Sequence, residues 1–291
     1  MRVFIAGAGL MGQGIAVDLA KRYDVILYDV SEQAIERARD MVGKLAEGYE
    51  LEGKVDFTME IGDAKSCDLI IESVFENLDV KVEVLSKLER ITSPKSPPLC
   101  SNTSVICIDD IAERLDSRER FMGVHWMNPP HVMPLVEIIL SQYTKEENAD
   151  FVEDILKEIG KETVMCRNQS LVNRFNAAVL AEASKMIEEG VDHRHIDRVW
   201  KAHLGLLYTL FGPLGNLDYI GLDVVYSASL YLHQRFQDEK YRPPAWLKEK
   251  IDKGELGVKT GRGIYSYTDF ESAYVDRVRR IESLLKFLGL K

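Results

Sequence analysis

The stretch RVFIAGAGLMGQGIAVDLAKRYDVILYD, residues 2–29, decides the fold. It reads as a short apolar strand, a turn with glycines spaced as GxGxxG, a helix, and a second strand that ends at Asp29. The glycine spacing alone is a weak signal, but this order of elements, closed by an acidic residue, is the context in which a sheet binds a dinucleotide. The stretch therefore predicts the first β-α-β unit of a Rossmann-type sheet.

Each position of the glycine motif has a physical role in holding a dinucleotide. Gly7 permits the tight turn, Gly9 lets the backbone approach a pyrophosphate, and Gly12 lets the helix pack closely on the strand. The helix N-terminus, with Leu10 and Met11, would supply N–H donors to the phosphates. The alternative is a glycine-rich turn that binds no ligand.

Asp29 predicts which cofactor binds. Its carboxylate would accept a hydrogen bond from the 2′-hydroxyl of the adenine ribose, and it would repel the 2′-phosphate of NADP. We therefore expect the cofactor to be NAD.

The remaining sequence divides into an α/β half and a helical half. Short apolar runs alternate with amphipathic segments up to ETVMCR, residues 162–167, and the strand signal then stops. From residue 171 onward, apolar residues recur at helical spacing. We predict an α/β protein with a mostly parallel, Rossmann-type, NAD-binding domain in residues 1–168. An all-α domain for substrate binding and dimerisation would follow in residues 169–291.

Composition argues against several kinds of partner. The 291 residues carry a net charge of −10, which argues against nucleic acid and against an anionic membrane surface. No apolar run approaches the length of a membrane span, and strand-like sequence from Arg2 leaves no room for a signal peptide. The four cysteines have neither metal nor disulfide spacing and read as buried thiols, so we expect a cytoplasmic protein.

A second stretch, GVHWMNPPHVMPLVEII at residues 123–139, embeds polar side chains in an apolar run. It could hold a hydrogen-bonded core histidine, a metal, or a general base oriented by a carboxylate. A zinc site would need a third ligand beside His125 and His131, and none has suitable spacing. The residues alone leave the core histidine and the general base equally favoured. Two interpretations of SNTSVI, residues 101–106, are likewise equally favoured: a turn that caps a helix, and a loop that binds cofactor or substrate.

Several segments together resemble the L-3-hydroxyacyl-CoA dehydrogenase family, and the last of them is most similar to its bacterial 3-hydroxybutyryl-CoA members. The segments keep the family's order nearly from end to end: GAGLMGQGIA, ESVFENLDVK, SNTS, the stretch at 123–139, VNR at 172–174, GPLGNLDYIGLD at 212–223, and KYRPPAWLKEKIDKGELGVKTGRGIYSY at 240–267. The resemblance implies NAD-dependent oxidation of a (3S)-3-hydroxyacyl-CoA to the 3-ketoacyl-CoA, and the reverse. It also implies a homodimer through the helical half, which apolar stretches such as LLYTLF and VVYSASLYL favour.

The resemblance also assigns roles to single residues. His125 matches the catalytic base and Glu137 its carboxylate partner. Ser104 and Asn173 match the residues that hold the reacting oxygen. The implied NAD contacts include Glu76, Lys81, Ser104, Asn128 and Lys259, and the implied acyl-CoA contacts are Ser104, Lys81 and Asn173.

A histidine paired with a glutamate suits this chemistry. A secondary alcohol releases a hydride only as its hydroxyl proton leaves, and a neutral imidazole accepts that proton well. A carboxylate on the other ring nitrogen fixes the tautomer and stabilises the imidazolium. Two adjacent strands, joined by the turn at residues 128–130, would bring His125 and Glu137 together.

The sequence departs from the family pattern at three places. The segment between Asp29 and Glu72 is shorter than in typical members, in which a helical arm there helps to hold the CoA. The family has a Pro-Gly-Phe turn before its Asn-Arg pair, whereas RNQSLVNR, residues 167–174, is shorter. HLGLLYTLFGP, residues 203–213, has the length seen in relatives that oxidise free acids such as L-gulonate or carnitine. Those relatives have an arginine near the position of Leu207, and that arginine could pair with a free carboxylate. Leu207 cannot form such a pair, so an acyl thioester is favoured as the substrate. A catalytically idle, crystallin-like relative is a further alternative, and the intact set of catalytic residues argues against it.

Overall fold

The structure is a computed structural model that describes residues 1–93 and 95–290. The chain divides into two compact units, Met1–Leu180 and Ala181–Lys291. Helix α6 (Leu171–Glu188) runs across this division. The domain boundary that we place after residue 168 stays a prediction, and the last residue of the expected helical domain, residue 291, lies outside the described residues.

In the described residues, unit 1 contains one eight-stranded sheet in the order β3-β2-β1-β4-β5-β6-β7-β8. Its neighbouring strands are parallel except for the antiparallel pair β6–β7, which confirms the mostly parallel sheet predicted above. The strands are β1 (Arg2–Ala6), β2 (Asp24–Tyr28), β3 (Val55–Thr58), β4 (Leu69–Glu72), β5 (Leu99–Ser101), β6 (Phe121–Trp126), β7 (Leu135–Leu140) and β8 (Glu162–Arg167). The helices are α1 (Leu10–Ala20), α2 (Glu32–Ala46), α3 (Leu78–Thr92), α4 (Ile108–Ala112) and α5 (Glu146–Glu158), with 3-10 turns η1 (Ile61–Ser66) and η2 (Arg118–Arg120).

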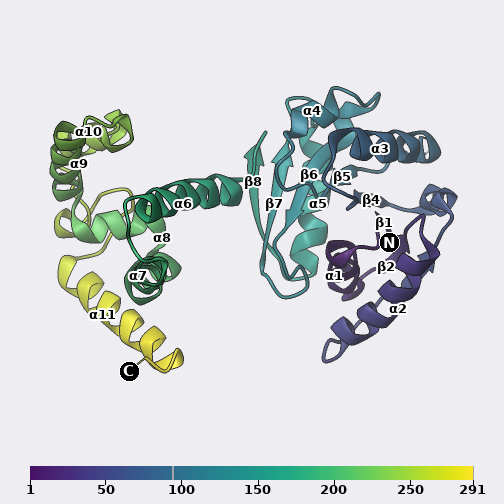
Figure 1. The fold of residues 1–291 in the computed structure, drawn as a ribbon, viewed down its shortest axis with the longest axis horizontal. Coiled ribbons are helices and arrows are strands. Elements are labelled where there is room, and N and C mark those ends of the chain that lie inside the picture. The colour runs from purple at the N-terminus through teal and green to yellow at the C-terminus, as the bar shows by residue number, and fades with distance from the viewer. Residues whose placement is uncertain (94, 291) are drawn as a thin grey trace. The chain divides into compact units, whose positions relative to one another are not determined.

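Side-chain alternation along the strands places the sheet between two helical layers. In β1, Val3 and Ile5 pack with α1 and α2, whereas Phe4 and Ala6 pack with α3 and α4. Figure 1 shows these two pairs of helices on opposite sides of the sheet. Because both faces of a central parallel strand are buried, the strand reads as a continuous apolar run.

The loop between β1 and α1 requires its glycines. Gly7 has φ +113°, a left-handed conformation that side chains rarely adopt, and a Cβ there would collide with the backbone of Ser73. A Cβ on Gly12 would collide with the carbonyl of Gly7. A Cβ on Gly9 would meet no atom of the described residues within 4 Å. The space in front of the α1 N-terminus is therefore open to a ligand.

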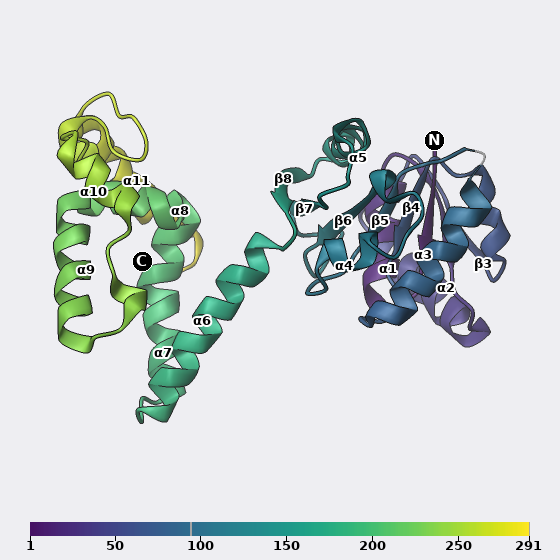
Figure 2. The same cartoon turned by 90° about the horizontal axis from the view of Figure 1, so that it is seen from above.

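Unit 2 is mostly helical in its described residues. Besides the second half of α6 it contains α7 (His193–Val199), the π-helical η3 (Trp200–Leu204), α8 (Gly205–Ile220), α9 (Leu222–Phe236), η4 (Glu239–Tyr241), α10 (Ala245–Asp252), η5 (Val258–Thr260) and α11 (Phe270–Phe287). Helix α8 is kinked at Gly212, directly before Pro213, because proline cannot continue the helical hydrogen bonds. Helices α8 and α9 lie side by side (Figure 2), and Arg277 of α11 stacks on Tyr219 of α8.

Two further expectations concern membranes and thiols. Within residues 1–93 and 95–290, no helix is both long and apolar enough to cross a membrane. All four cysteines are free; Cys67 and Cys100 are buried, but Cys107 and Cys166 are only half-buried. The expectation of four buried thiols is therefore wrong for these two, because Cys107 lies in a loop and Cys166 lies on β8, an edge strand.

Candidate active site

His125 and Glu137 face each other across the antiparallel strands β6 and β7. They are direct partners in the strand register, and His125 Nδ1 lies 3.0 Å from Glu137 Oε2. Both are buried, His125 with 6% and Glu137 with 1% of its surface exposed. In the described residues no hydrogen bond engages His125 Nε2, so this nitrogen is the one that a ligand could use.

Glu137 is tolerated in the apolar run of β7 because the strand alternates. Its two neighbours pack into the core with α1 and α5, so Glu137 points to the opposite face of the sheet. There its carboxylate accepts hydrogen bonds from His125 Nδ1, the Ser170 hydroxyl and the Val172 amide. Burial raises the pKa of Glu137, but these donors outweigh burial and hold the pKa below its usual value. The carboxylate is therefore an anion beside the imidazole.

The SNTS loop after β5 is held by the carboxylate of Glu76. Its Oε1 accepts the Thr103 hydroxyl and the amides of Ser104 and Val105, the two amides at 2.9 and 3.1 Å. The side chain of Asn102 accepts a backbone amide at the end of β6 at 3.0 Å. These contacts fix the backbone of Ser104 relative to the strand that carries His125.

A buried ion pair supports Glu76. Lys81 Nζ lies 2.9 Å from Glu72 Oε1 and 3.1 Å from Glu76 Oε2, and its side chain is 1% exposed. Burial raises the pKa of Glu72 despite the Lys81 charge and the Ser101 hydroxyl. Hydrogen bonds to the SNTS loop and the Lys81 ammonium outweigh burial at Glu76 and lower its pKa. Because both residues have partners inside the protein, the cofactor contacts implied for Glu76 and Lys81 stay predictions.

Ser104 and Asn173, which come from distant parts of the sequence, lie next to each other. Asn173 Nδ2 donates a hydrogen bond to the Ser104 carbonyl. Both residues, with Ser170, line a cavity of about 210 Å³ between the SNTS loop and the first turns of α6. His125 does not line this cavity, but Glu137 accepts from Ser170 and so connects His125 to it.

The expected cofactor end of the site surrounds the glycine loop. Asp29 stands at the end of β2 and accepts the amides of Ala8 and Ser31, each at 3.0 Å. Among the residues that the structure describes, no side chain caps the N-terminus of α1, and Leu10 there is 63% exposed. Free N–H donors, the open space at Gly9 and an acidic residue at the end of β2 are the features that a dinucleotide needs. The residues therefore fit NAD.

Two implied cofactor contacts lie elsewhere. Asn128 is exposed in the loop after β6. Lys259 belongs to unit 2, where its ammonium lies 2.6 and 2.7 Å from the two carboxylate oxygens of Asp223. Both contacts stay predictions.

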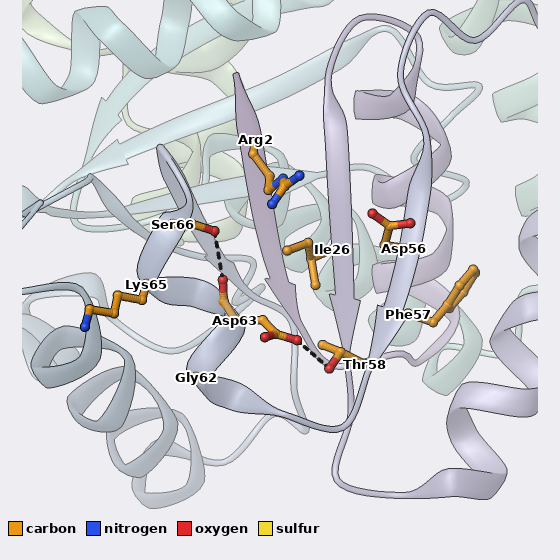
Figure 3. A pocket seen from close by; sticks show the side chains of 9 residues that line it. All are labelled: Arg2, Ile26, Asp56, Phe57, Thr58, Gly62, Asp63, Lys65 and Ser66. Atoms are coloured by element: carbon orange, nitrogen blue, oxygen red, sulfur yellow. Dashed lines mark hydrogen bonds between the residues drawn. The ribbon is translucent and has the colours of Figure 1, made fainter.

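A second cavity of about 510 Å³ lies on the sheet at β1, β2 and β3, separated from β6 by β4 and β5. Figure 3 shows that Ile26 and Arg2 lie on its strands, and that Asp63 is hydrogen-bonded to Thr58 at its rim. It is lined by Arg2, Ile26, Asp56, Phe57, Thr58, Gly62, Asp63, Lys65 and Ser66. None of the site residues inferred from the sequence is among them, so the candidate active site is the one around His125.

The family can be decided by comparison with known proteins. The family model for the NAD-binding domain of 3-hydroxyacyl-CoA dehydrogenase matches residues 2–169, and the one for its C-terminal domain matches residues 171–267. The chain belongs to the 3-hydroxyacyl-CoA dehydrogenase family. Helix α11 lies beyond the part that the second family model matches.

Similar proteins include members of this family with different names. A crystal structure of a 3-hydroxyacyl-CoA dehydrogenase from Archaeoglobus fulgidus is 61% identical, covers 100% of both chains and has a TM-score of 0.93. A probable 3-hydroxybutyryl-CoA dehydrogenase of Deinococcus radiodurans is 34% identical over 92% of this chain and 100% of its own. The 5-formyl-3-hydroxy-2-methylpyridine 4-carboxylate 5-dehydrogenase of Mesorhizobium japonicum is 32% identical over 98% of this chain and 97% of its own. A solved NAD⁺-dependent dismutase of that name is 30% identical over 99% of this chain and 98% of its own, with a TM-score of 0.76.

Sequence reasoning missed two residues that the structure places in this dehydrogenase site. Glu72 anchors Lys81, and Ser170 contacts Glu137. A feature of the sequence could have pointed to each of these residues. Glu72 is a carboxylate in a buried apolar strand, which needs a partner, and Ser170 precedes a periodic helix, where a cap is expected.

Proposed function

We propose that this protein oxidises a (3S)-3-hydroxyacyl-CoA to the 3-ketoacyl-CoA with NAD, and that it catalyses the reverse reduction. The observation that supports this most is the 3.0 Å contact between His125 and Glu137, beside the SNTS loop, in a chain of this family. The oxidised cofactor, when bound, would accept the hydride in the oxidation, and the reduced cofactor would supply it in the reverse reduction.

The side chains around His125 would handle the proton. Nε2 would take it from the substrate hydroxyl, because Nδ1 faces Glu137. Glu137 would keep the imidazole in that tautomer and stabilise the imidazolium. Ser104 and Asn173 would hold the reacting oxygen. In the reverse direction His125 would protonate the ketone oxygen; such assistance is worth about 10²–10⁴ in rate.

Initial rates with NADH test the proposal. We expect turnover of acetoacetyl-CoA or of longer 3-ketoacyl-CoAs, and much slower turnover of the corresponding free keto acids. Turnover restricted to the free acids would show that the thioester assignment is wrong. No reaction with any of these substrates would favour a catalytically idle protein.

A second candidate substrate is a small aromatic carboxylate without CoA. The match to the pyridine-carboxylate dehydrogenase covers 98% of this chain, whereas the match to the Deinococcus protein covers 92%. Against this candidate, Leu207 is buried in α8 and offers no charge to a carboxylate. Including 5-formyl-3-hydroxy-2-methylpyridine 4-carboxylate in the same assay decides between the two.

Asp29 should make the enzyme prefer NAD over NADP. Its carboxylate is fixed by two backbone amides at the end of β2, where a 2′-phosphate would meet a like charge. We expect kcat/KM to be at least about tenfold higher with NAD than with NADP, equivalent to about 1.4 kcal/mol. Asp29→Ser should lower this ratio of the two kcat/KM values. Equal use of NADP by the wild type in steady-state kinetics would refute the assignment.

We also propose a homodimer formed through unit 2. The buried apolar side chains in its described residues are Leu207, Leu222, Leu247 and Val258. Large apolar side chains are instead exposed, including Tyr231 at 64% and Phe236 at 59%. Such exposure on a small helical unit is typical of an obligate interface.

Light scattering at micromolar concentration should therefore give twice the chain mass. Phe236→Glu should shift the protein toward monomer, because it places a charge in the apolar contact. Phe151→Glu, at an aromatic residue 41% exposed in unit 1, is the matched control and should leave the mass unchanged. A wild-type monomer would contradict the proposal.

A further inference from the structure

The hydroxyl of Ser170 makes two contacts that join separate parts of the site. It donates to Glu137 Oε2, and it accepts the backbone amide of Asn173 at 3.0 Å. Ser170 is 4% exposed. It directly precedes α6, and Asn173 is the third residue of that helix. An acceptor at this position for the third helical amide is the geometry of a helix N-cap.

The same helix start engages the other oxygen of Glu137. The Val172 amide donates to Glu137 Oε1 at 3.0 Å, so the carboxylate lies against the N-terminus of an 18-residue helix. Helix N-termini carry partial positive charge, which favours an anion there. Oε2 is shared between Ser170 and His125. The carboxylate cannot rotate without breaking a contact to α6 or to the imidazole.

We propose that Ser170 is a positioning residue for the dehydrogenase reaction. Its hydroxyl fixes the Glu137 carboxylate against His125 and, through the cap, fixes the helical turn that carries Asn173. The inference rests on the proposed function and extends it, because it couples the proton-transfer pair to the residue that would hold the substrate oxygen. Ser170 lies in RNQSLVNR, the segment where the sequence departs from the family pattern.

Loss of this hydroxyl has a predictable electrostatic effect. A carboxylate with fewer hydrogen-bond donors keeps more negative charge on the oxygen that faces the imidazole. The ion pair between the imidazolium and the carboxylate is then more stable relative to the neutral imidazole. In the part of the chain that the structure describes, the titratable groups facing Glu137 are His125 on β6 and the Cys166 thiol on β8. Burial and then the Glu137 charge raise the pKa of that thiol. Arg174 lines the adjoining cavity. The acid limb of the pH profile should therefore move to higher pH when Ser170 loses its hydroxyl.

Three variants separate the contact to Glu137 from the cap. Ser170→Ala removes both functions, whereas Ser170→Gly removes the hydroxyl but keeps a residue that is well tolerated at an N-cap. Ser170→Thr keeps the hydroxyl. Asp269→Ala is the control for loss of a helix cap, because Asp269 caps α11 through the amide of Ser272 and does not touch Glu137.

Kinetics of 3-hydroxybutyryl-CoA oxidation by full-length protein are the first test. In Ser170→Ala and Ser170→Gly we expect kcat to fall about tenfold, the acid limb of kcat/KM to move to higher pH, and KM for NAD to stay the same. Ser170→Thr should restore both kcat and the pH profile, and Asp269→Ala should leave the pH profile unchanged. An unchanged pH profile in Ser170→Gly would overturn the inference. A fall in kcat that only follows the fall in melting temperature from variant to variant would overturn it as well.

A second readout needs no substrate. The NMR resonance of the His125 Nδ1 proton reports its hydrogen bond to Glu137, so it should move in Ser170→Gly and return in Ser170→Thr. If it does not move, Ser170 does not position the pair. If it moves but the wild type turns over no 3-hydroxyacyl-CoA, the coupling stands and the proposed substrate is wrong.

Discussion

Replacing His125 with Gln is expected to lower kcat for 3-hydroxyacyl-CoA oxidation by about 10²–10⁴. Gln keeps the size of the side chain and one hydrogen bond, but it cannot take a proton at the position of Nε2. NADH affinity should be nearly unchanged, because the glycine loop joins β1 to α1 and Asp29 directly follows β2, whereas His125 lies on β6. Steady-state kinetics with acetoacetyl-CoA and a fluorescence titration with NADH measure the two quantities.

Glu137→Gln is the companion variant. It keeps the contact distance but removes the negative charge beside the imidazole, so kcat should fall while the preference for NAD, which depends on Asp29, is retained. Near-native turnover by His125→Gln would rule out His125 as the proton-transfer residue. His131, the other histidine of the stretch at 123–139, would then be the next candidate.

Replacing Lys81 with Met is expected to lower the free energy of unfolding by about 3–5 kcal/mol, because it leaves the buried Glu72 carboxylate without its counter-charge. Lys87→Met is the matched control on the same helix. Lys87 pairs with Glu83 at the surface, where solvent screens the pair and the loss should be much smaller. Urea denaturation of both variants measures the difference, and equal losses would contradict the buried-pair argument.

The destabilisation of Lys81→Met should also depend on pH. Burial raises the pKa of Glu72 in the folded protein, and the Lys81 charge opposes this rise. Without Lys81 this rise is no longer opposed, so the pKa of Glu72 lies higher still in the folded variant than in the folded wild type. The loss of unfolding free energy in Lys81→Met, relative to the wild type, should therefore be full above the pKa of Glu72 in the folded variant. It should shrink as the pH falls through that pKa. A deficit that is constant with pH would show that lost packing, rather than the unpaired charge, causes it.

Local sequence patterns determined the first β-α-β unit. The glycine spacing, the apolar runs and the acidic residue at the end of β2 all lie within 28 residues. The glycine spacing reflects a left-handed turn at Gly7 and close packing at Gly12, and the apolar runs reflect strands that are buried on both faces. The helical second half could be predicted for the same reason. Strand β3 and the kink at Gly212 were not predicted, because a four-residue strand at a sheet edge and a helix broken by Gly-Pro leave weak periodic signals.

The partners of the polar side chains were decided only by the tertiary structure. The sequence marked His125 and Glu137 as candidates, but their contact depends on the register of β6 and β7. Ser170 reaches Glu137 across 33 residues, and Asn173 reaches Ser104 across 69. A residue pattern encodes which positions are buried, whereas the pairing of buried polar groups depends on how strands and loops meet after the chain has folded. Sequence alone therefore identified the cofactor fold and the candidate base, and the folded chain decided which groups hold that base in place.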